Sequence, residues 1–137
     1  MNLEILIKQG IGDVRFGMTM TEAEKILGQP TETENIDDAT GEQITVIHYD
    51  DQELSLFFEG ADKLLNCIDI SNEDTTLFGE KIFDKNEREI VSLLVANKYY
   101  EQDIENEAWG ERRVSFADGN IDLFFVDNEL SSVSIGR

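Results

Sequence analysis

The stretch LSLFF at positions 54–58 recurs as IDLFF at positions 121–125, 67 residues further along the chain. Two more pairs flank it in the same order. Phe16-Gly17 returns as Phe78-Gly79 after 62 residues, and LNCIDI at 65–70 returns as LSSVSI at 130–135 after 65 residues. One such block can arise by chance, but three in order indicate a tandem duplication. We therefore expect a single domain over residues 1–137, built from two repeats at about 10–72 and 73–137.

Each repeat opens with a helical pattern. Thr21 to Glu24 fits a capping box, in which a threonine hydroxyl and a glutamate three residues later satisfy free amide groups at the helix start. Gly28-Gln29-Pro30 then ends the helix. The second repeat opens similarly at Asp84 to Glu87. Its apolar stripe from Ile90 to Ala96 is broader, so we expect the second helix to be longer.

Three short apolar runs follow each helix. They are Ile44 to Tyr49, Leu54 to Phe58 and Leu65 to Ile70, then Arg112 to Phe116, Ile121 to Val126 and Leu130 to Ile135. Each unit is therefore a helix followed by a three-strand meander. We expect the two units to form one continuous antiparallel sheet with the helices on one face, which is an α+β fold in two layers. We expect Leu3 to Ile7 to add a strand at an edge, and the polar segment Thr31 to Gly41 to be a solvated loop.

The charge of the chain narrows the classes of partner. Its 137 residues include 11 Lys+Arg and 30 Asp+Glu, a formal net charge of -19. Such a protein is repelled by phosphate backbones and anionic lipid headgroups, which disfavours nucleic-acid and membrane-surface binding and favours a basic protein partner. Acidity also serves solubility by itself. No run of apolar residues is long enough to span a membrane, and we expect a cytoplasmic protein.

The sequence offers little for catalysis or metal binding. With one histidine, His48, and one cysteine, Cys67, it supplies neither a disulfide nor a usual zinc set. His48 has no recognisable nucleophile or second histidine beside it, and Cys67 lies in an apolar strand without a neighbouring cation. The paired acids lack the spacing of a calcium loop. We predict no catalytic residue, no metal and no cofactor.

Aromatic residues are the more informative candidates. Period-two alternation sends Leu54, Leu56 and Phe58 to one face of their strand and Phe57 to the other. Phe124 holds the matching place in the second repeat. If the helices cover the first face, Phe57 and Phe124 lie on the open face, and turn acids such as Asp51 and Asp118 form a charged rim, as at a protein-binding surface. The alternative is that the sheet curls over the two rings or that a loop covers them.

The segment Asn97 to Glu111 is acidic but contains Tyr99, Tyr100 and Trp109, residue types that are enriched at interfaces. Either these side chains contact a partner, or the tyrosines pack the second helix onto the sheet and Trp109 covers the core. Both interpretations stay open at this stage.

GMTMTEAEKILGQP at positions 17–30 resembles the motif of the SmpA/OmlA lipoprotein domain and of related repeats in the beta-lactamase inhibitor protein. The second repeat keeps Gly79 but not the Gly-x-Pro ending. The resemblance implies a pair of repeats whose concave sheet grips another protein. It transfers a fold more firmly than a function.

These observations favour a non-enzymatic protein-binding module of the immunity or inhibitor type, directed at a basic protein. One alternative is an envelope-related or housekeeping scaffold that binds a peptide at a sheet edge. A hydrolase that uses His48 ranks last. The sequence does not specify the oligomeric state.

Overall fold

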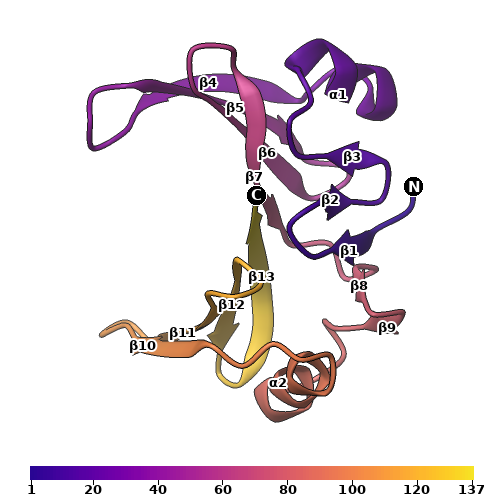
Figure 1. Cartoon of the computed structure of the whole chain (residues 1–137), viewed down its shortest axis with the longest axis vertical. Coiled ribbons are helices and arrows are strands. Elements are labelled where there is room, and N and C mark those ends of the chain that lie inside the picture. The colour runs from indigo at the N-terminus through magenta and orange to yellow at the C-terminus, as the bar shows by residue number, and fades with distance from the viewer.

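An eight-stranded antiparallel sheet dominates the computed structural model, which describes residues 1–137 (Figure 1). Its strand order is β10-β11-β12-β13-β7-β6-β5-β4, so two four-strand meanders meet where β13 pairs with β7. The strands of the first meander are β4 (Glu32–Asp37), β5 (Gln43–Tyr49), β6 (Leu54–Glu59) and β7 (Leu64–Ile70). Those of the second are β10 (Gln102–Asn106), β11 (Glu111–Phe116), β12 (Ile121–Val126) and β13 (Glu129–Gly136).

The meanders have four strands, not the three predicted, because β4 and β10 lack the apolar runs on which the prediction depends. β4 occupies most of the expected loop Thr31 to Gly41, and that expectation is wrong. Every residue of β4 and of β10 is exposed. An edge strand needs a hydrogen-bonded neighbour on one side only, so it forms without the apolar alternation that reveals a buried strand.

A second, five-stranded sheet lies beside the first. It consists of β1 (Glu4–Leu6), β2 (Gly10–Ile11), β3 (Val14–Arg15), β8 (Thr76–Leu77) and β9 (Glu80–Lys81). The strands of both meanders lie in one continuous antiparallel sheet, as predicted. The N-terminal strand, however, is β1 of this second sheet, so its expected place at an edge of the large sheet is wrong. β1 pairs in parallel with β8, and the Glu4 carboxylate accepts hydrogen bonds from the Thr76 hydroxyl and, at 2.9 Å, from the Gly79 amide. These contacts join the start of the chain to its second half.

Both helices begin with a capping box. The box lies two residues earlier than predicted in the first helix and two residues later in the second. α1 (Met20–Leu27) is capped by Thr19 with Glu22, and α2 (Glu87–Ala96) by Asn86 with Glu89. The boxes predicted at Thr21 to Glu24 and Asp84 to Glu87 are thus corrected. Gly28, with φ of 86°, ends α1 as expected. α2 has 10 residues against 8 in α1, which confirms that the second helix is longer.

One core joins the helices, the small sheet and one face of the large sheet. Leu56 of β6 and Leu123 of β12 lie in it, both fully buried, together with Ala23 of α1 and Ile90 of α2. Figure 1 shows the helices and the small sheet on one side of the curved large sheet. The opposite face has no such cover. The fold class is α+β, with a mostly β chain.

Candidate binding face of the large sheet

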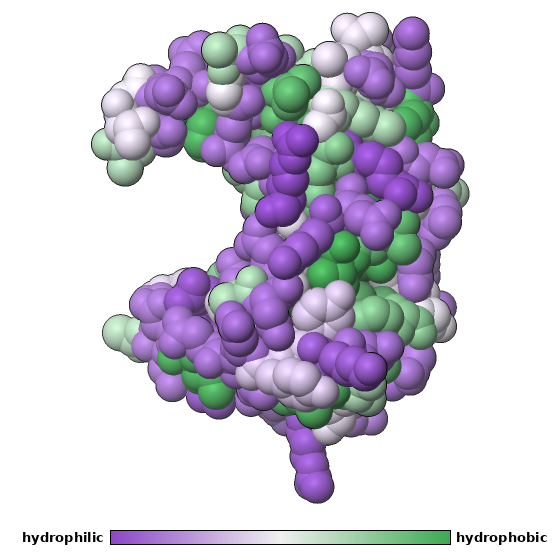
Figure 2. All heavy atoms as spheres, viewed as in Figure 1, coloured by the Kyte–Doolittle hydropathy of each residue, from purple (hydrophilic) through white to green (hydrophobic).

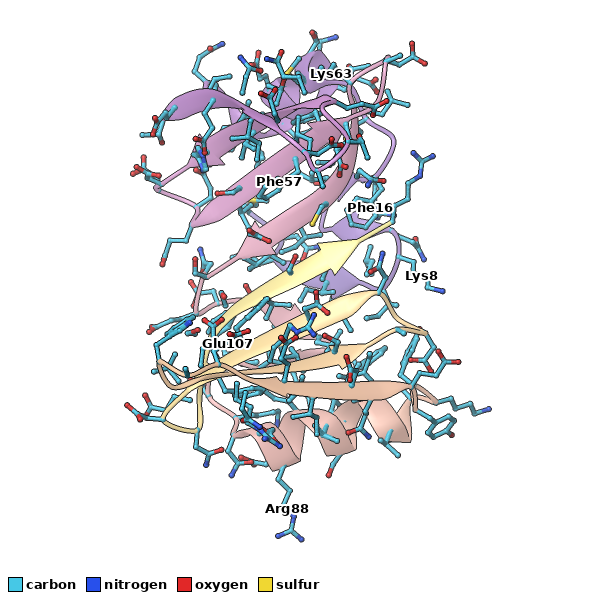
Figure 3. All side chains as sticks on the ribbon, turned by 90° about the vertical axis from the view of Figure 1, so that its left-hand side faces the viewer. Lys8, Phe16, Phe57, Lys63, Arg88 and Glu107 are labelled. Carbon is cyan, nitrogen blue, oxygen red and sulfur yellow. The ribbon has the colours of Figure 1, made fainter.

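The face opposite the core is hollowed, and we call it the concave face. Figure 2 shows the molecule as a C whose inner side is mainly hydrophilic, and Figure 3 looks onto that side, with Phe57 upon it. Bulges in both halves contribute to the curvature, since the register shifts between Phe57 and Phe58 and again between Phe124 and Phe125. A bulge bends its strand and increases the local twist.

A continuous row of polar residues crosses the concave face, one from each of the eight strands. Each member lies directly opposite the next in the strand register. We call it the polar row, and its members in order are Glu32, His48, Ser55, Asp69, Ser134, Asp122, Ser115 and Asp103. The row carries four carboxylates and one imidazole, and it has no lysine or arginine.

Asp69 and Ser134 form the middle of this row, where the two meanders meet. The Asp69 side chain reaches solvent, but the protein packed around it raises the pKa of its carboxyl above the usual value. The nearby Asp122 carboxylate raises this pKa further, while a hydrogen bond from Ser134 and the charge of His48 oppose the shift. The centre of the face therefore holds negative charge that its own neighbours do not fully compensate.

His48 is hydrogen-bonded on both ring nitrogens. Its Nδ1 lies 2.7 Å from Ser55 Oγ, and its Nε2 lies 2.7 Å from Glu34 Oε1. The arrangement is a Glu–His–Ser chain that spans three strands. It can hold or move a proton, but no group of three or more His, Cys, Asp or Glu side chains is placed to bind a metal. The prediction that the chain has no catalytic residue stays untested.

Cys67 lies on the concave face beside the polar row. Its Sγ is 3.4 Å from Ser134 Oγ, and burial raises the pKa of the thiol, with the negative charges of Asp69, Glu59 and Asp122 adding to the shift. A thiol with a raised pKa is protonated at neutral pH and is a poor nucleophile. Two of these acids, Glu59 and Asp122, line a hollow of about 250 Å³ together with Cys67.

The two predicted aromatics flank the polar row on opposite sides. Phe57 lies between Val46 and Cys67 in the register, whereas Phe124 lies between Arg113 and Ser132. Both rings are half-buried, because neighbouring side chains shield part of each. Alternation thus located both residues on the uncovered face.

The remaining predicted contact residues are dispersed. Tyr99 packs against the core and stacks on Phe78, with ring centroids 6.2 Å apart, as the packing interpretation expects. The Tyr100 amide donates to Asp118 Oδ2 at 2.8 Å, and the other carboxylate oxygen of Asp118 is buried without a partner. Asp118 therefore joins the β11–β12 turn to the segment that follows α2.

Asp51 and Trp109 lie apart from the two rings. Asp51 is exposed and lines a hollow with the first residues of the chain. Trp109, which is 68% exposed, lies in the turn of the β10–β11 hairpin and does not cover the core. Of the seven predicted contact residues, the structure brings only Phe57 and Phe124 onto the concave face by strand register.

A hollow of about 530 Å³ lies elsewhere, where Lys85 and Asn86 precede α2 and face the β12–β13 turn. It is open and polar. The acids of β4 and β10 on the concave face, Glu32, Glu34, Asp103 and Glu105, were missed by sequence reasoning because their strands were missed. The alternation of acids in TETENID and QDIEN is the signal that could have revealed them.

Comparison with known proteins gives a fold and no family. No family model and no curated protein matches the sequence. The structure is similar to that of an extracellular protein containing a SCP domain from Bacillus anthracis str. Ames, with a TM-score of 0.51 and 16% sequence identity. The match covers 95% of this chain and 49% of that chain, so this chain spans about half the neighbour's length. At this identity the likeness concerns the fold alone.

Neither helix has the length and apolar character needed to cross a membrane.

Proposed function

We propose that the chain is a non-enzymatic protein-binding module whose concave face binds a basic protein, in a role of the immunity or inhibitor type. The observation that carries this proposal is the polar row with its flanking residues. The basic residues among the polar row and its immediate neighbours are Arg113 and His48. The acidic residues are six: Glu32, Glu34, Asp69, Asp103, Glu105 and Asp122. A concave acidic surface steers a convex basic surface toward it and repels anionic competitors.

A duplicated architecture is part of the same proposal. Three features support it: the meanders have equal strand numbers, their bulges fall at matching places, and Asp69 lies opposite Ser134, the residue 65 positions later in the aligned repeats. Two like units joined in this way have a pseudo-two-fold axis through the middle of the sheet. The axis places two similar arms around one concave surface.

The test begins with capture of a protein from the source lysate at low salt and continues with the purified captured protein. Its association rate should fall steeply between about 50 and about 500 mM salt, because screening weakens steering. The Asp69→Asn/Asp122→Asn variant should associate about tenfold more slowly. Glu73→Gln/Asp127→Asn removes the same charge from exposed positions around the hollow near α2 and should change the rate little.

A rate that is indifferent to salt, or equal losses in the two double variants, would refute the concave face as the binding site. The edge-binding scaffold is the second candidate, since β4 and β10 each leave one edge unpaired. The acids along both strands are typical of edges protected against pairing, which favours the concave face. An association rate that changes neither with salt nor in either double variant would favour binding at a sheet edge. The cytoplasmic location stays a prediction.

A further inference from the structure

The two rows that flank the polar row differ in chemistry. The N-terminal flanking row is Glu34, Val46, Phe57 and Cys67. The C-terminal flanking row is Glu105, Arg113, Phe124 and Ser132. Each runs from an edge strand toward the centre of the sheet, and each contains one phenylalanine. They differ most at the second position, where a valine in one row corresponds to an arginine in the other.

The N-terminal side carries a small apolar patch outside the main core. Val46 is only 1% exposed, yet it does not belong to the core cluster, so residues of the concave face shield it. Phe57 lies opposite Val46, and Ile44 lies opposite Ile36, which is 40% exposed. We call Ile36, Ile44, Val46 and Phe57 the N-terminal patch. It is an apolar surface that remains partly open to solvent.

On the C-terminal side an arginine compensates part of the negative charge. The Arg113 guanidinium lies 2.5 Å from Glu105 Oε2 and 3.7 Å from Asp103 Oδ2. Arg113 also lies directly opposite Phe124, so a cation adjoins that ring. One positive charge thereby offsets part of the charge of two of the six acids, and a basic partner meets a guanidinium beside the ring on this side. The acids that pair with no lysine or arginine lie at the centre and on the N-terminal side, where Glu34 contacts His48.

We propose that the basic partner docks on the N-terminal half of the concave face, through a segment in which lysine or arginine residues flank one apolar side chain. The apolar side chain contacts the N-terminal patch, and the cations face Glu32 on the same half and Asp69 and Asp122 at the centre of the face. This inference rests on the proposed function and assigns it to one half of the face. The partner needs cations because they complement the acids, and it needs an apolar residue because part of the N-terminal patch is exposed.

Two pentapeptides of equal charge test the inference: Lys-Lys-Phe-Lys-Lys and Lys-Lys-Gly-Lys-Lys, each with blocked ends. Each is titrated at low salt into the ¹⁵N-labelled full chain, and amide chemical shifts report the site. We expect the phenylalanine peptide to bind about fivefold more tightly, from partial burial of its ring. The shifts it induces should centre on β4 to β7.

Matched variants at the two phenylalanines separate the halves. Phe57→Ser should reduce the affinity for the phenylalanine peptide to that for the glycine peptide, whereas Phe124→Ser should leave it unchanged. Ile36→Ser alters an exposed patch residue and should weaken binding about twofold, which provides a test if Phe57→Ser fails to fold. Thermal melts of each variant establish that it is folded.

Arg113→Val supplies the reciprocal test, because it gives the C-terminal row the residue found in the N-terminal row and releases Asp103 and Glu105. The number of phenylalanine peptides bound should rise from one to two. Arg88→Val makes the same charge change on an exposed residue that projects from α2 away from the sheet (Figure 3), and it should leave the number at one.

Equal affinity for the two peptides, or equal effects of the two phenylalanine substitutions, would overturn the docking inference and leave the proposed function standing. Absence of binding by either peptide at low salt would overturn both.

Discussion

The two meanders, β4 to β7 and β10 to β13, are alike on the core face and unlike on the concave face. On the core face the matching pairs are Leu56 and Leu123, Phe58 and Phe125, Leu65 and Leu130, and Ile70 and Ile135, all buried. On the concave face His48 corresponds to Ser115, and Val46 to Arg113. Close packing restricts which side chains fit in a core, while an open face accepts many residue types. The proposed binding site lies on the face where the two meanders differ.

The largest expected effect concerns the core face, where the two meanders are alike. Leu56→Ala and Leu123→Ala each remove a fully buried side chain from the shared core. We expect each to lower the free energy of unfolding by about 2–5 kcal/mol, with similar values in the two halves. Urea denaturation measures both. If one variant lost less than about 1 kcal/mol, the halves would not share one core.

A smaller effect tests the helix starts. Thr19→Ala and Asn86→Ala each remove a capping side chain and should cost about 0.5–2 kcal/mol of stability. Thr21→Ala changes a residue inside α1 and should cost less than about 0.5 kcal/mol. Urea denaturation of the three variants checks this order. A larger loss of stability from Thr21→Ala than from Thr19→Ala would indicate that Thr21, and not Thr19, caps the helix.

The ion pairs of Arg113 sharpen the contrast between the concave halves. Arg113→Gln breaks partly exposed pairs with Glu105 and Asp103, so the stability loss should be about 0.2–1 kcal/mol. The loss should shrink at about 1 M salt, where such pairs are screened. Denaturation at low and high salt measures it. A loss that salt does not alter would indicate that packing of the arginine stem dominates.

The smallest effect concerns Asp69 at the centre. Its raised pKa means that the native state binds this proton more tightly than the unfolded chain does, so the charged form costs stability at neutral pH. Asp69→Asn should therefore stabilise the protein slightly at pH 7, by less than about 1 kcal/mol for a side chain that reaches solvent.

The gain from Asp69→Asn should vanish as pH falls through the native pKa toward 3.8, because the wild-type carboxyl then becomes protonated. Urea denaturation at pH 7, 5 and 3.5 compares the two proteins. A variant that is less stable than wild type at pH 7 would contradict this account of the centre. If Asp69→Asn is more stable than wild type but associates more slowly with the partner, then Asp69 serves binding at a cost in stability.

Sequence predicted the parts of the fold that depend on burial. Strands such as β6 and β12 alternate apolar residues on one face, and the structure places them as expected. β4 and β10 were missed because both of their faces are polar, and the small sheet was missed because most of its strands have two residues. The α1 cap was misplaced because Thr19 to Glu22 and Thr21 to Glu24 both satisfy the same motif.

The candidate face shows the same division. Alternation within one strand sufficed to locate Phe57 and Phe124 on the open side. The polar row required the register of eight strands, including the pairing of Asp69 with Ser134, and no local pattern encodes that pairing. The contrast between Val46 and Arg113 likewise emerged only when both were located beside the phenylalanines.

The most direct test of the concave face is photo-cross-linking from both sides of the sheet. A benzophenone amino acid replaces Phe57 on the concave face in one variant and Val95, an exposed residue of α2, in the other. We predict that position 57 traps a basic protein from the source lysate at about 50 mM salt, that this product is lost at about 500 mM, and that position 95 traps none of it. Equal trapping of that protein from both positions, or trapping at 57 that persists at high salt, would contradict the account.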